Sequence, residues 1–415
     1  MAGKPDLLFL TQRIPYPPIK GEKIRPLQIL RHLAKRYRVH LGCLVDDPAD
    51  MAHVETVRAL CASAHFAPLD RKHAKILCLR GLLTGEPLSV TFFHDQGLAN
   101  WVGEVLRTIR PQVIFVCSSN MASYVLDRDC NNAVRLVDLA DVDSEKWRAY
   151  AESGRPPMRW VHHREWRKTA ALEARIAREC DWSTFVSTAE AQLFAHLLPD
   201  DAPRIRAITS GVDHGYFDPN LPSAPLFDTA RANYVFTGTM DYKPNIDAVV
   251  WFAEAVLPLI RQTRPDAQFH VVGSNPAPQV QKLADIQGVF ITGRVADVRP
   301  YVAYATAAVA PMRIARGIQN KVLEAMAMAR PVVVTPGALE GIDATPGREV
   351  LLAENAESFA AACLLTLEPQ TQAIGDAARR KVVAEYIWSE RLRGFDALLD
   401  PHGLAEPATL EDCPS

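Results

Sequence analysis

Residues 310–335 have the sequence APMRIARGIQNKVLEAMAMARPVVVT, which contains the pattern of a strand, a loop, a helix and a second strand. The first strand is predicted to end at Pro311, and the helix is predicted to begin near Gln319–Lys321. Pro331 starts the next strand. Because a helix that connects two strands at this spacing is typical of a parallel sheet, the stretch predicts a doubly wound α/β domain.

The start of this predicted helix suits the binding of a diphosphate. Its free backbone N–H groups and the positive end of its dipole lie at the carboxyl edge of the sheet, where an anion is stabilised. Arg313 and Lys321 add positive charge, and Glu324, one turn into the helix, can accept two hydroxyl protons of a ribose. The alternative interpretation places Lys321 and Glu324 on an ordinary solvated helix face.

The alternation of strands and helices extends outward from this stretch over most of the chain. In the same half of the chain it includes Tyr234–Phe236, Asn245–Arg264, Ala267–Val272, Gly288–Ile291, Tyr301–Ala307 and Ala308–Ala310. An earlier series consists of Leu7–Leu10, Leu27–Arg38, Val39–Val45, Met51–Ala62, Val113–Val116 and Met121–Leu126. Two serial α/β units therefore predict two Rossmann-like domains with parallel sheets that face each other across a cleft.

The expected domain boundaries follow from composition. A stretch rich in Pro and Asp, between Pro199 and Pro225, joins an N-terminal domain of residues 1–205 to a second domain of residues 206–385. A long helical segment is predicted from Glu357 to Leu399, and its last part, residues 386–400, is expected to pack back on the first domain. Residues 401–415 are expected to form a flexible tail.

Composition and charge exclude several classes of protein. The chain has 415 residues, of which 48% are hydrophobic and 23% charged, and these ordinary values exclude a disordered chain. The net charge of -2 combines +4 in residues 1–205 with -6 in the remainder. Since +4 over about two hundred residues is far below the basic charge of a nucleic-acid-binding protein, nucleic acid is not an expected partner.

The cysteines and the apolar runs indicate the compartment. None of the 8 Cys residues forms a CxxC pair, so neither a zinc site nor a disulfide framework is supported. The first apolar run, Leu7–Leu10, is too short for a secretion signal, and no run of about 18 apolar residues predicts a membrane span. We therefore expect a cytoplasmic protein.

Several motifs together resemble the donor-site signature of family 4 glycosyltransferases, which are retaining enzymes with the GT-B fold. The matching stretches are Leu323–Ala327 with Arg330–Val333, Phe236–Asn245, Thr292–Val298 and Gly211–Asp213. Within that family the chain most resembles the sugar transferases of exosortase (PEP-CTERM) exopolysaccharide systems, through Pro15–Pro18, Lys20–Arg25 and Asp138–Trp147.

The resemblance implies roles for individual residues. Glu324 matches the acid that binds the nucleotide ribose, and Gln319, Asn320 and Lys321 match the positions whose amides meet the diphosphate. Gly238 matches the glycine that the donor phosphates approach, and Arg294 lies in the loop that frames the base. The resemblance implies no metal and no other cofactor. The remaining expected donor contacts are Thr239, Lys243, Arg313, Arg316 and Gly317.

Three positions depart from the family pattern. Arg316 stands where the family usually has a second Glu that touches sugar hydroxyls, Thr239 replaces an Arg, and Pro244 replaces a phosphate-binding Lys. The adjacent Lys243 is a substitute for that lysine. These departures leave open the sugar preference and the manner in which the diphosphate is held.

Two basic segments of the first domain have candidate roles. The predicted loop Arg13–Arg25 follows the first strand, where Gly21 allows a ligand to approach and Lys20 or Lys23 neutralises phosphate; a solvated basic loop is the alternative. The next helix, Leu27–Arg38, combines cations with leucines. This pattern suits peripheral contact with an anionic membrane and equally suits an ordinary surface helix.

Acidic residues follow the predicted strand Val134–Val137. Asp138 or Asp141 is interpreted as a carboxylate that orients an acceptor hydroxyl, with capping of a turn as the alternative. Asp141 and Asp143 form a DxD motif, which binds metal in other sugar transferases, but no metal is expected here.

The leading interpretation is a glycosyltransferase that moves a sugar with retention from a nucleotide diphosphate donor to a glycan or lipid-linked acceptor in exopolysaccharide biosynthesis. Lys321, Glu324 and Asp141 are the expected catalytic residues. A nucleotide-sugar 2-epimerase and a non-catalytic nucleotide-sugar-binding subunit of a membrane assembly are the alternatives.

Overall fold

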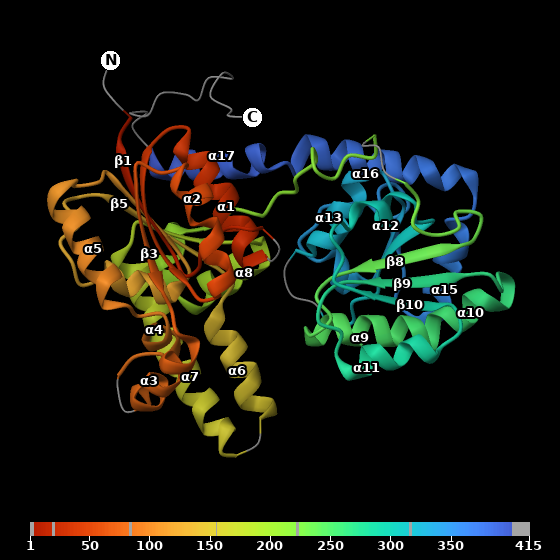
Figure 1. Cartoon of the computed structure of the whole chain (residues 1–415), viewed down its shortest axis with the longest axis horizontal. Coiled ribbons are helices and arrows are strands. Elements are labelled where there is room, and N and C mark those ends of the chain that lie inside the picture. Colours follow the sequence, from red (N-terminus) through yellow and green to blue (C-terminus); the bar gives the residue numbers. More distant parts are fainter. Residues whose placement is uncertain are drawn as a thin grey trace. The chain divides into compact units, whose positions relative to one another are not determined.

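The chain forms two compact units, each built around a parallel sheet (Figure 1). The computed structural model describes residues 4–18, 21–82, 85–154, 156–220, 224–314 and 318–400. The first unit comprises the chain up to Thr209 and again from Leu392, and the second unit comprises Ser210–Arg391. The sequence analysis placed the boundary between the two domains at residue 205. It also predicted that residues 386–400 pack on the first domain.

The described part of the first unit contains a seven-stranded parallel sheet with the order β3-β2-β1-β4-β5-β6-β7. The order reverses between β1 and β4, which is the topological switch point of a doubly wound fold. The strands are β1 (Asp6–Thr11), β2 (Arg38–Val45), β3 (Ser63–Pro68), β4 (Val113–Cys117), β5 (Val134–Ala140), β6 (Trp182–Phe185) and β7 (Ile205–Ala207).

Helices connect these strands, and most of them cover the faces of the sheet. They are α1 (Gly21–Ala34), α2 (Val54–Arg58), α3 (Arg71–Gly81), α4 (Leu88–Phe92), α5 (Gln96–Thr108), α6 (Asp143–Ser153), α7 (Met158–Glu179), α8 (Thr188–Leu197) and α17 (Trp388–Leu399). Short 3-10 turns lie at Pro48–His53, Ser119–Tyr124 and Pro199–Arg204. The hairpin of α6 and α7 extends away from the sheet, with α3 and α4 beside α7 (Figure 1).

The second unit contains, in its described residues, a six-stranded parallel sheet with the order β10-β9-β8-β11-β12-β13. Its strands are β8 (Asn233–Thr237), β9 (Gln268–Val272), β10 (Val289–Gly293), β11 (Ala307–Ala310), β12 (Val332–Val334) and β13 (Leu351–Leu352). Its helices are α9 (Lys243–Trp251), α10 (Leu257–Thr263), α11 (Pro278–Gln281), α12 (Arg299–Ala303), α13 (Asn320–Ala327), α14 (Pro336–Leu339), α15 (Ala356–Leu365) and α16 (Gln372–Glu385). A π-helical segment, Phe252–Val256, joins α9 to α10, and 3-10 turns lie at Lys282–Asp285 and Pro369–Thr371.

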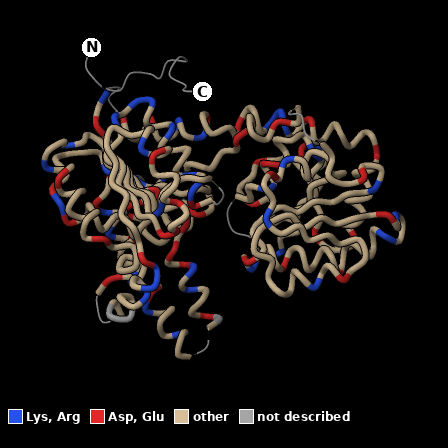
Figure 2. Tube along the Cα trace, viewed as in Figure 1, with Lys and Arg blue, Asp and Glu red and all other residues tan. Residues whose placement is uncertain are grey.

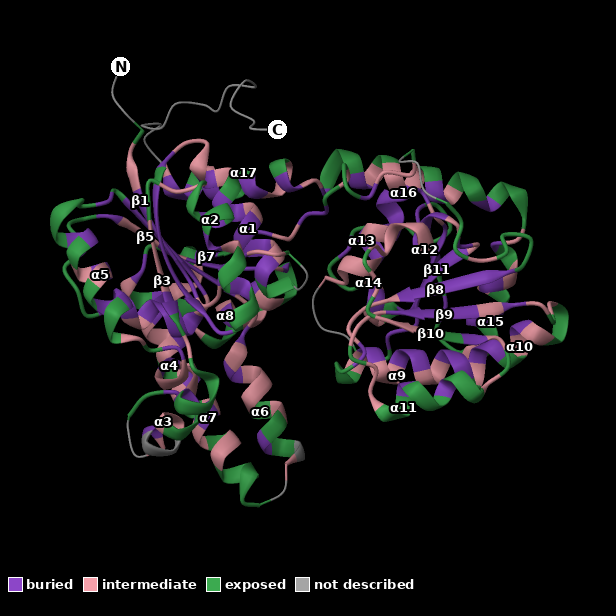
Figure 3. Cartoon of the chain, in the orientation of Figure 1, coloured by how far each residue is buried: buried purple, intermediate pink, exposed green. Residues whose placement is uncertain are grey.

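The central strands of both sheets are largely buried, whereas the edge strands β3, β7, β10 and β13 are partly exposed (Figure 3). Apolar strands covered by helices on both faces are what a parallel sheet requires, because its connections place a helix on each face. The prediction of two Rossmann-like α/β domains from the strand and helix pattern is confirmed.

The helix at the start of the first unit is longer than the sequence predicted. Residues 21–25 belong to α1, although the sequence analysis placed them in a loop that ends at Arg25. Two buried ion pairs hold this first part of the helix, from Lys23 to Asp50 at 2.6 Å and from Arg25 to Asp138 at 2.7 Å. Such tertiary contacts offset the backbone hydrogen bond that Pro26 removes.

The predicted long helical segment from Glu357 to Leu399 is divided into three helices. The chain forms α15, then a short 3-10 turn at Pro369, then α16 and α17. Helix α16 ends at Glu385, and Val212 pairs with Ile387 as an isolated parallel bridge, so the chain is extended there. This bridge replaces helical hydrogen bonds and lets the chain return to the first unit through α17.

Among the described residues, none of the helices is both long enough and apolar enough to span a bilayer. The cysteines of the described segments, Cys43, Cys61, Cys78, Cys117, Cys130, Cys180 and Cys363, are all free thiols. Cys413 lies outside the described residues.

Candidate functional site

The carboxyl edge of the second sheet gathers the residues that the sequence singled out. Gly238 follows β8, Gly273 follows β9, and the segment that leads to Arg313 follows β11. Helix α13 then begins at Asn320 with Gln319 as its N-cap residue, as the sequence predicted. Ligands of open α/β sheets bind at this edge, so it is the first place to look for a site.

Lys321 is the central cation of this edge. Its Nζ donates to Oδ1 of Asn245 at 3.1 Å and to Oε1 of Gln319 at 3.3 Å, and it lies 4.9 Å from the centre of the Phe236 ring. Burial lowers the pKa of Lys321 to about 8, and the Glu324 carboxyl acts in the opposite direction. An ammonium group that is desolvated and contacted by neutral oxygens, the Met312 sulfur and a ring has a strong need for an anionic partner.

Asn245 links this cation to the loop after β8. Its side chain is only 5% exposed, and its Nδ2 donates to the carbonyl of Thr239 at 2.9 Å while its Oδ1 accepts from Lys321. Since both ends of the amide are engaged, the orientation of Asn245 is determined. The sequence analysis did not assign this role to Asn245, although the residue lies within the quoted stretch Phe236–Asn245.

Glu324 lies one turn further along α13. Burial raises the pKa of its carboxyl to about 7, and Lys321 opposes this shift. In the described part of the chain, its carboxyl oxygens have no hydrogen-bond partner of their own. The group is therefore available to accept hydroxyl protons from a ligand, as a ribose would supply them.

The first turn of α13 offers backbone donors as well. The helix has no side-chain cap within the described residues, and the amide of Val322 is the one bonded to the Gln319 carbonyl. First-turn amides of such a helix, with Lys321 beside them, form a place for a phosphate group.

The glycines at the ends of β8 and β9 lie in direct contact. A Cβ atom on Gly273 would lie 1.6 Å from the carbonyl oxygen of Gly238, and one on Gly238 would lie 2.8 Å from Nδ2 of Asn245. The amide of Gly238 donates to the Val272 carbonyl at 3.1 Å. Only glycine fits this packing, which brings the backbone at Gly238 and Thr239 to the edge of the sheet.

The other predicted donor contacts have different surroundings. Arg313 forms a two-pronged ion pair with Asp247 of α9, at 2.5 and 3.0 Å, and lies over the ring of Trp251. Lys243 is the exposed first residue of α9, and Arg294 is exposed after β10. Arg316 and Gly317 lie outside the described residues.

A cluster that the sequence analysis missed connects two of the quoted motifs. Arg299 lies 4.1 Å from the centre of the Tyr216 ring and pairs with Asp297 at 2.7 Å. The hydroxyl of Tyr216 in turn donates to Asp297 at 3.2 Å. The segment after Gly211–Asp213 is thereby fixed to the loop that follows Arg294.

The candidate residues of the first unit form internal ion pairs. Asp138 is 3% exposed, and its oxygens accept from Arg25 at 2.7 and 2.8 Å and from the Thr184 hydroxyl at 2.8 Å. Lys23 is 7% exposed and paired with Asp50. Because these contacts hold α1 on the sheet, we do not assign Asp138 and Lys23 to the candidate site. Gly21 is the exposed first residue of α1, and Lys20 lies outside the described residues.

The DxD pair already has a cation from the chain. Asp141 and Asp143 accept from Lys146 at 2.8 and 3.0 Å, and the pKa of Lys146 is raised by these carboxylates against the effect of its burial. No cluster of three metal-ligating side chains occurs in the described segments.

Part of the basic face that suggested membrane contact, at the end of α1, is paired within the first unit. His32 and Arg36 pair with Asp396 at 2.9 and 3.2 Å, and Arg36 also pairs with Asp400 at 3.3 Å. These carboxylates reduce the positive charge at His32 and Arg36, whereas Arg31 is exposed.

The Asn245 amide provides a test of how Lys321 is positioned. Asn245→Leu removes both hydrogen bonds at similar volume, so Lys321 loses its fixed orientation, and affinity for a diphosphate ligand is expected to fall by about tenfold. Isothermal titration with a nucleoside diphosphate measures this. Asn245→Gln retains the amide and is expected to recover part of the affinity, which a purely structural loss would not do. Unchanged affinity in Asn245→Leu would remove this residue from the site.

Comparisons with known proteins are consistent with this geometry. The family model described as Glycosyl transferases group 1 matches residues 231–368, which contain β8, α9, α13 and β12. No curated protein matches the chain.

Solved structures resemble the chain over nearly its full length. Sucrose-phosphate synthase from Thermosynechococcus elongatus has a TM-score of 0.66 at 18% identity, covering 96% of this chain and 99% of that one. Anabaena Alr3699/HepE in complex with UDP and glucose has a TM-score of 0.64 at 14% identity, covering 96% and 100%. A glycosyltransferase from Rickettsia africae ESF-5 has a TM-score of 0.62 at 16% identity, covering 96% and 99%.

These structures share the two-unit fold with this chain, and the family match falls on the segment that contains Lys321, Asn245 and Glu324. Together, the matched segment and the shared fold support the assignment of this protein as a glycosyltransferase with the GT-B fold.

Proposed function

We propose that this protein transfers a sugar from a nucleoside diphosphate sugar to a glycan or lipid-linked acceptor, with retention of the anomeric configuration, in exopolysaccharide biosynthesis. UDP-sugars are the first donors to test, because the similar Anabaena structure contains UDP and glucose. The observation that supports the proposal best is the desolvated Lys321 at the start of α13, held by Asn245 and followed by Glu324.

The proposed chemistry relies on charge stabilisation. When the bond between the sugar and the diphosphate breaks, negative charge develops on the leaving phosphate. Lys321 and the first amides of α13 are placed to stabilise this charge, and Glu324 is placed to hold the ribose. No nucleophile is required of the protein if the leaving phosphate accepts the proton of the acceptor hydroxyl. In this proposal Asp141 has no part in the bond-breaking step, since Lys146 occupies its carboxylate.

A panel of sugar nucleotides tests the proposal. The protein is incubated with each donor and with glycan or lipid-linked acceptors, and release of the nucleoside diphosphate is measured. Release that depends on the acceptor supports transfer, and the proton spectrum of the product reports whether the anomeric configuration is retained. Conversion of the donor to its 2-epimer without an acceptor would instead support the epimerase, which the glycosyl transferase match does not favour. Tight donor binding with no turnover would support a non-catalytic subunit.

The pH dependence of UDP binding tests the role of Lys321 separately. In the free protein the pKa of Lys321 is about 8, and a bound diphosphate raises it by stabilising the ammonium. The affinity for UDP is therefore expected to fall, by at most about tenfold per pH unit, as the pH rises above 8. Lys321→Arg stays charged over this range and is expected to lose the decrease. If UDP affinity still decreases above pH 8 in Lys321→Arg, a group other than Lys321 causes the decrease.

A further inference from the structure

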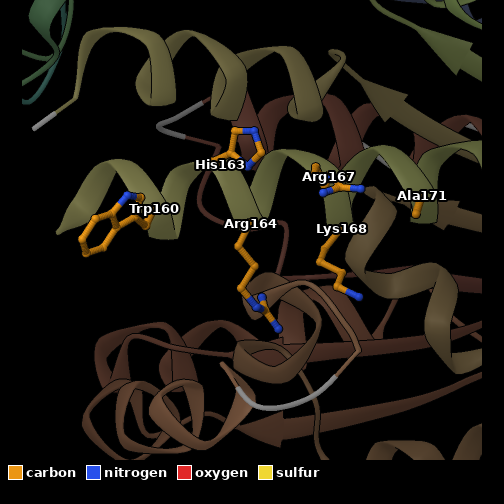
Figure 4. A pocket seen from close by; sticks show the side chains of 6 residues that line it. All are labelled: Trp160, His163, Arg164, Arg167, Lys168 and Ala171. Carbon is orange, nitrogen blue, oxygen red and sulfur yellow. The ribbon is translucent and has the colours of Figure 1, made fainter. Parts of the chain in front are cut away.

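Helix α7 has an exposed face that combines cations with a large aromatic side chain. Along its N-terminal half, a pocket of about 650 Å³ is lined by one stripe of the helix (Figure 4). We define the basic stripe as Trp160, His163, Arg164, Arg167 and Lys168; Ala171 continues it. The spacings of three and four residues place these side chains on one face. The opposite face contains the buried Glu165, Thr169 and Glu173.

Helix α3 and the basic stripe are joined by hydrogen bonds. Nη2 of Arg164 donates to the carbonyl of Gly81, the last residue of α3, at 2.8 Å and to that of Glu86 at 3.0 Å. Its neighbour Glu165 is fully buried, is paired with Arg164 and accepts from the amide of Leu88 at 2.7 Å. These bonds fix α3, the connection to α4 and α7 as one structural element.

The charge of this element is strongly positive. Helix α3 and residues 158–171 of α7 together contain eight Lys and Arg residues and one acid, the buried Glu165 (Figure 2). Within the part of the chain that the structure describes, Arg167 and Lys168 form no ion pair. Glu86 is the exposed acid closest in sequence to the contact, on the connection between α3 and α4. The first unit therefore has free positive charge here, in contrast to His32 and Arg36 of α1.

Apolar side chains project from the same two helices. Trp160 is 70% exposed and Met158 is 52% exposed at the start of α7, and Ile76 of α3 is 59% exposed between cations. A tryptophan beside lysines and arginines is typical of the boundary between water and lipid, where the ring enters the headgroup region while the cations meet phosphates. A binder of polyanions alone has no need of exposed Met158 and Ile76.

We propose that the basic stripe of α7, together with α3, docks the protein on an anionic phospholipid surface. Arg167 and Lys168 meet the lipid phosphates, Arg164 fixes the helix beside them, and Trp160 with Met158 enters the interface. The proposal goes beyond the proposed function and rests on residues of the first unit only. Membrane docking can therefore be absent while donor binding at Lys321 persists, and donor binding can be absent while docking persists.

Vesicle sedimentation of the full chain tests the proposal. Binding is expected to vesicles of phosphatidylglycerol and phosphatidylcholine, to weaken as salt is raised, and to be absent with phosphatidylcholine alone. Arg167→Glu combined with Lys168→Glu is expected to lower the partition coefficient by roughly thirtyfold or more, at about fivefold for each cation lost. Trp160→Ala is expected to weaken binding several-fold at every salt concentration.

The matched control is Arg107→Glu combined with Arg110→Glu, which changes the charge of the same unit equally at exposed positions outside α3 and α7. UDP affinity and the unfolding temperature verify that each variant is folded. Vesicle binding that falls equally in the control variant, or that fails altogether in the wild type, would overturn the proposal. So would binding of short RNA by the wild type with no binding to anionic vesicles.

Discussion

Lys321→Met is expected to lower kcat/KM for sugar transfer by about 10²–10³-fold, because it removes a preorganised positive charge from the leaving phosphate. Lys321 is already desolvated and oriented before the donor binds, by Asn245, Gln319 and the ring of Phe236. The ammonium therefore undergoes little reorganisation during the reaction, and its loss affects the transition state more than the bound substrate.

Initial rates of UDP release over a range of donor concentrations measure this effect. The control is Lys282→Met, which removes an exposed lysine of the same unit. A variant that raises KM alone would place Lys321 in donor binding without a contribution to bond breaking. A variant with wild-type kcat/KM would exclude Lys321 from the active site altogether.

Gly273→Ala is expected to destabilise the second unit by about 3–5 kcal/mol. The added Cβ would lie 1.6 Å from the carbonyl oxygen of Gly238, so the strands β8 and β9 must separate at their carboxyl ends. A flexible side chain could move aside at little cost, but this neighbour is backbone at the carboxyl end of the central strand β8. The loop of Gly238 and Thr239 would shift with it and carry Asn245 away from Lys321.

Urea and thermal unfolding measure the loss of stability, and for a unit of this size the transition is expected to fall by about 10 °C. UDP affinity should decrease in parallel. Gly215→Ala is the matched control, because its Cβ would meet only the Asp213 carboxylate at an ordinary distance of 3.6 Å. Equal behaviour of the two variants would show that the contact between the glycines is not tight in solution.

The part of the site that lies along one segment of chain was predictable from sequence. In residues 310–335 the strand end, the helix start at Gln319 and the position of Glu324 follow from local pattern, and the structure agrees. Asn245 was not assigned a role, because its function depends on a contact with Lys321, 76 residues away. Periodicity gives no information about which polar side chain of one loop meets which side chain of another.

The errors in the first unit have the same origin. Residues 21–25 were predicted as part of a loop, but the buried pair of Arg25 with Asp138, 113 residues away, stabilises a helix there. Likewise His32 and Arg36 of α1 looked free in the sequence, because Asp396 and Asp400 are 364 residues from their partners. Local patterns identified the elements, whereas long-range ion pairs decided which charges remain available.

The return of α17 to the first unit has a consequence for synthesis on the ribosome. Phe395 of this helix lies 5.0 Å from the ring of Phe115 and is fully buried in the first unit. All of Ser210–Arg391 is translated before it. At about 5–20 residues per second, the nascent first unit waits roughly 10–40 s for its last helix. The second unit is thus complete as soon as its own residues emerge, whereas the first unit lacks its last helix until synthesis is almost finished.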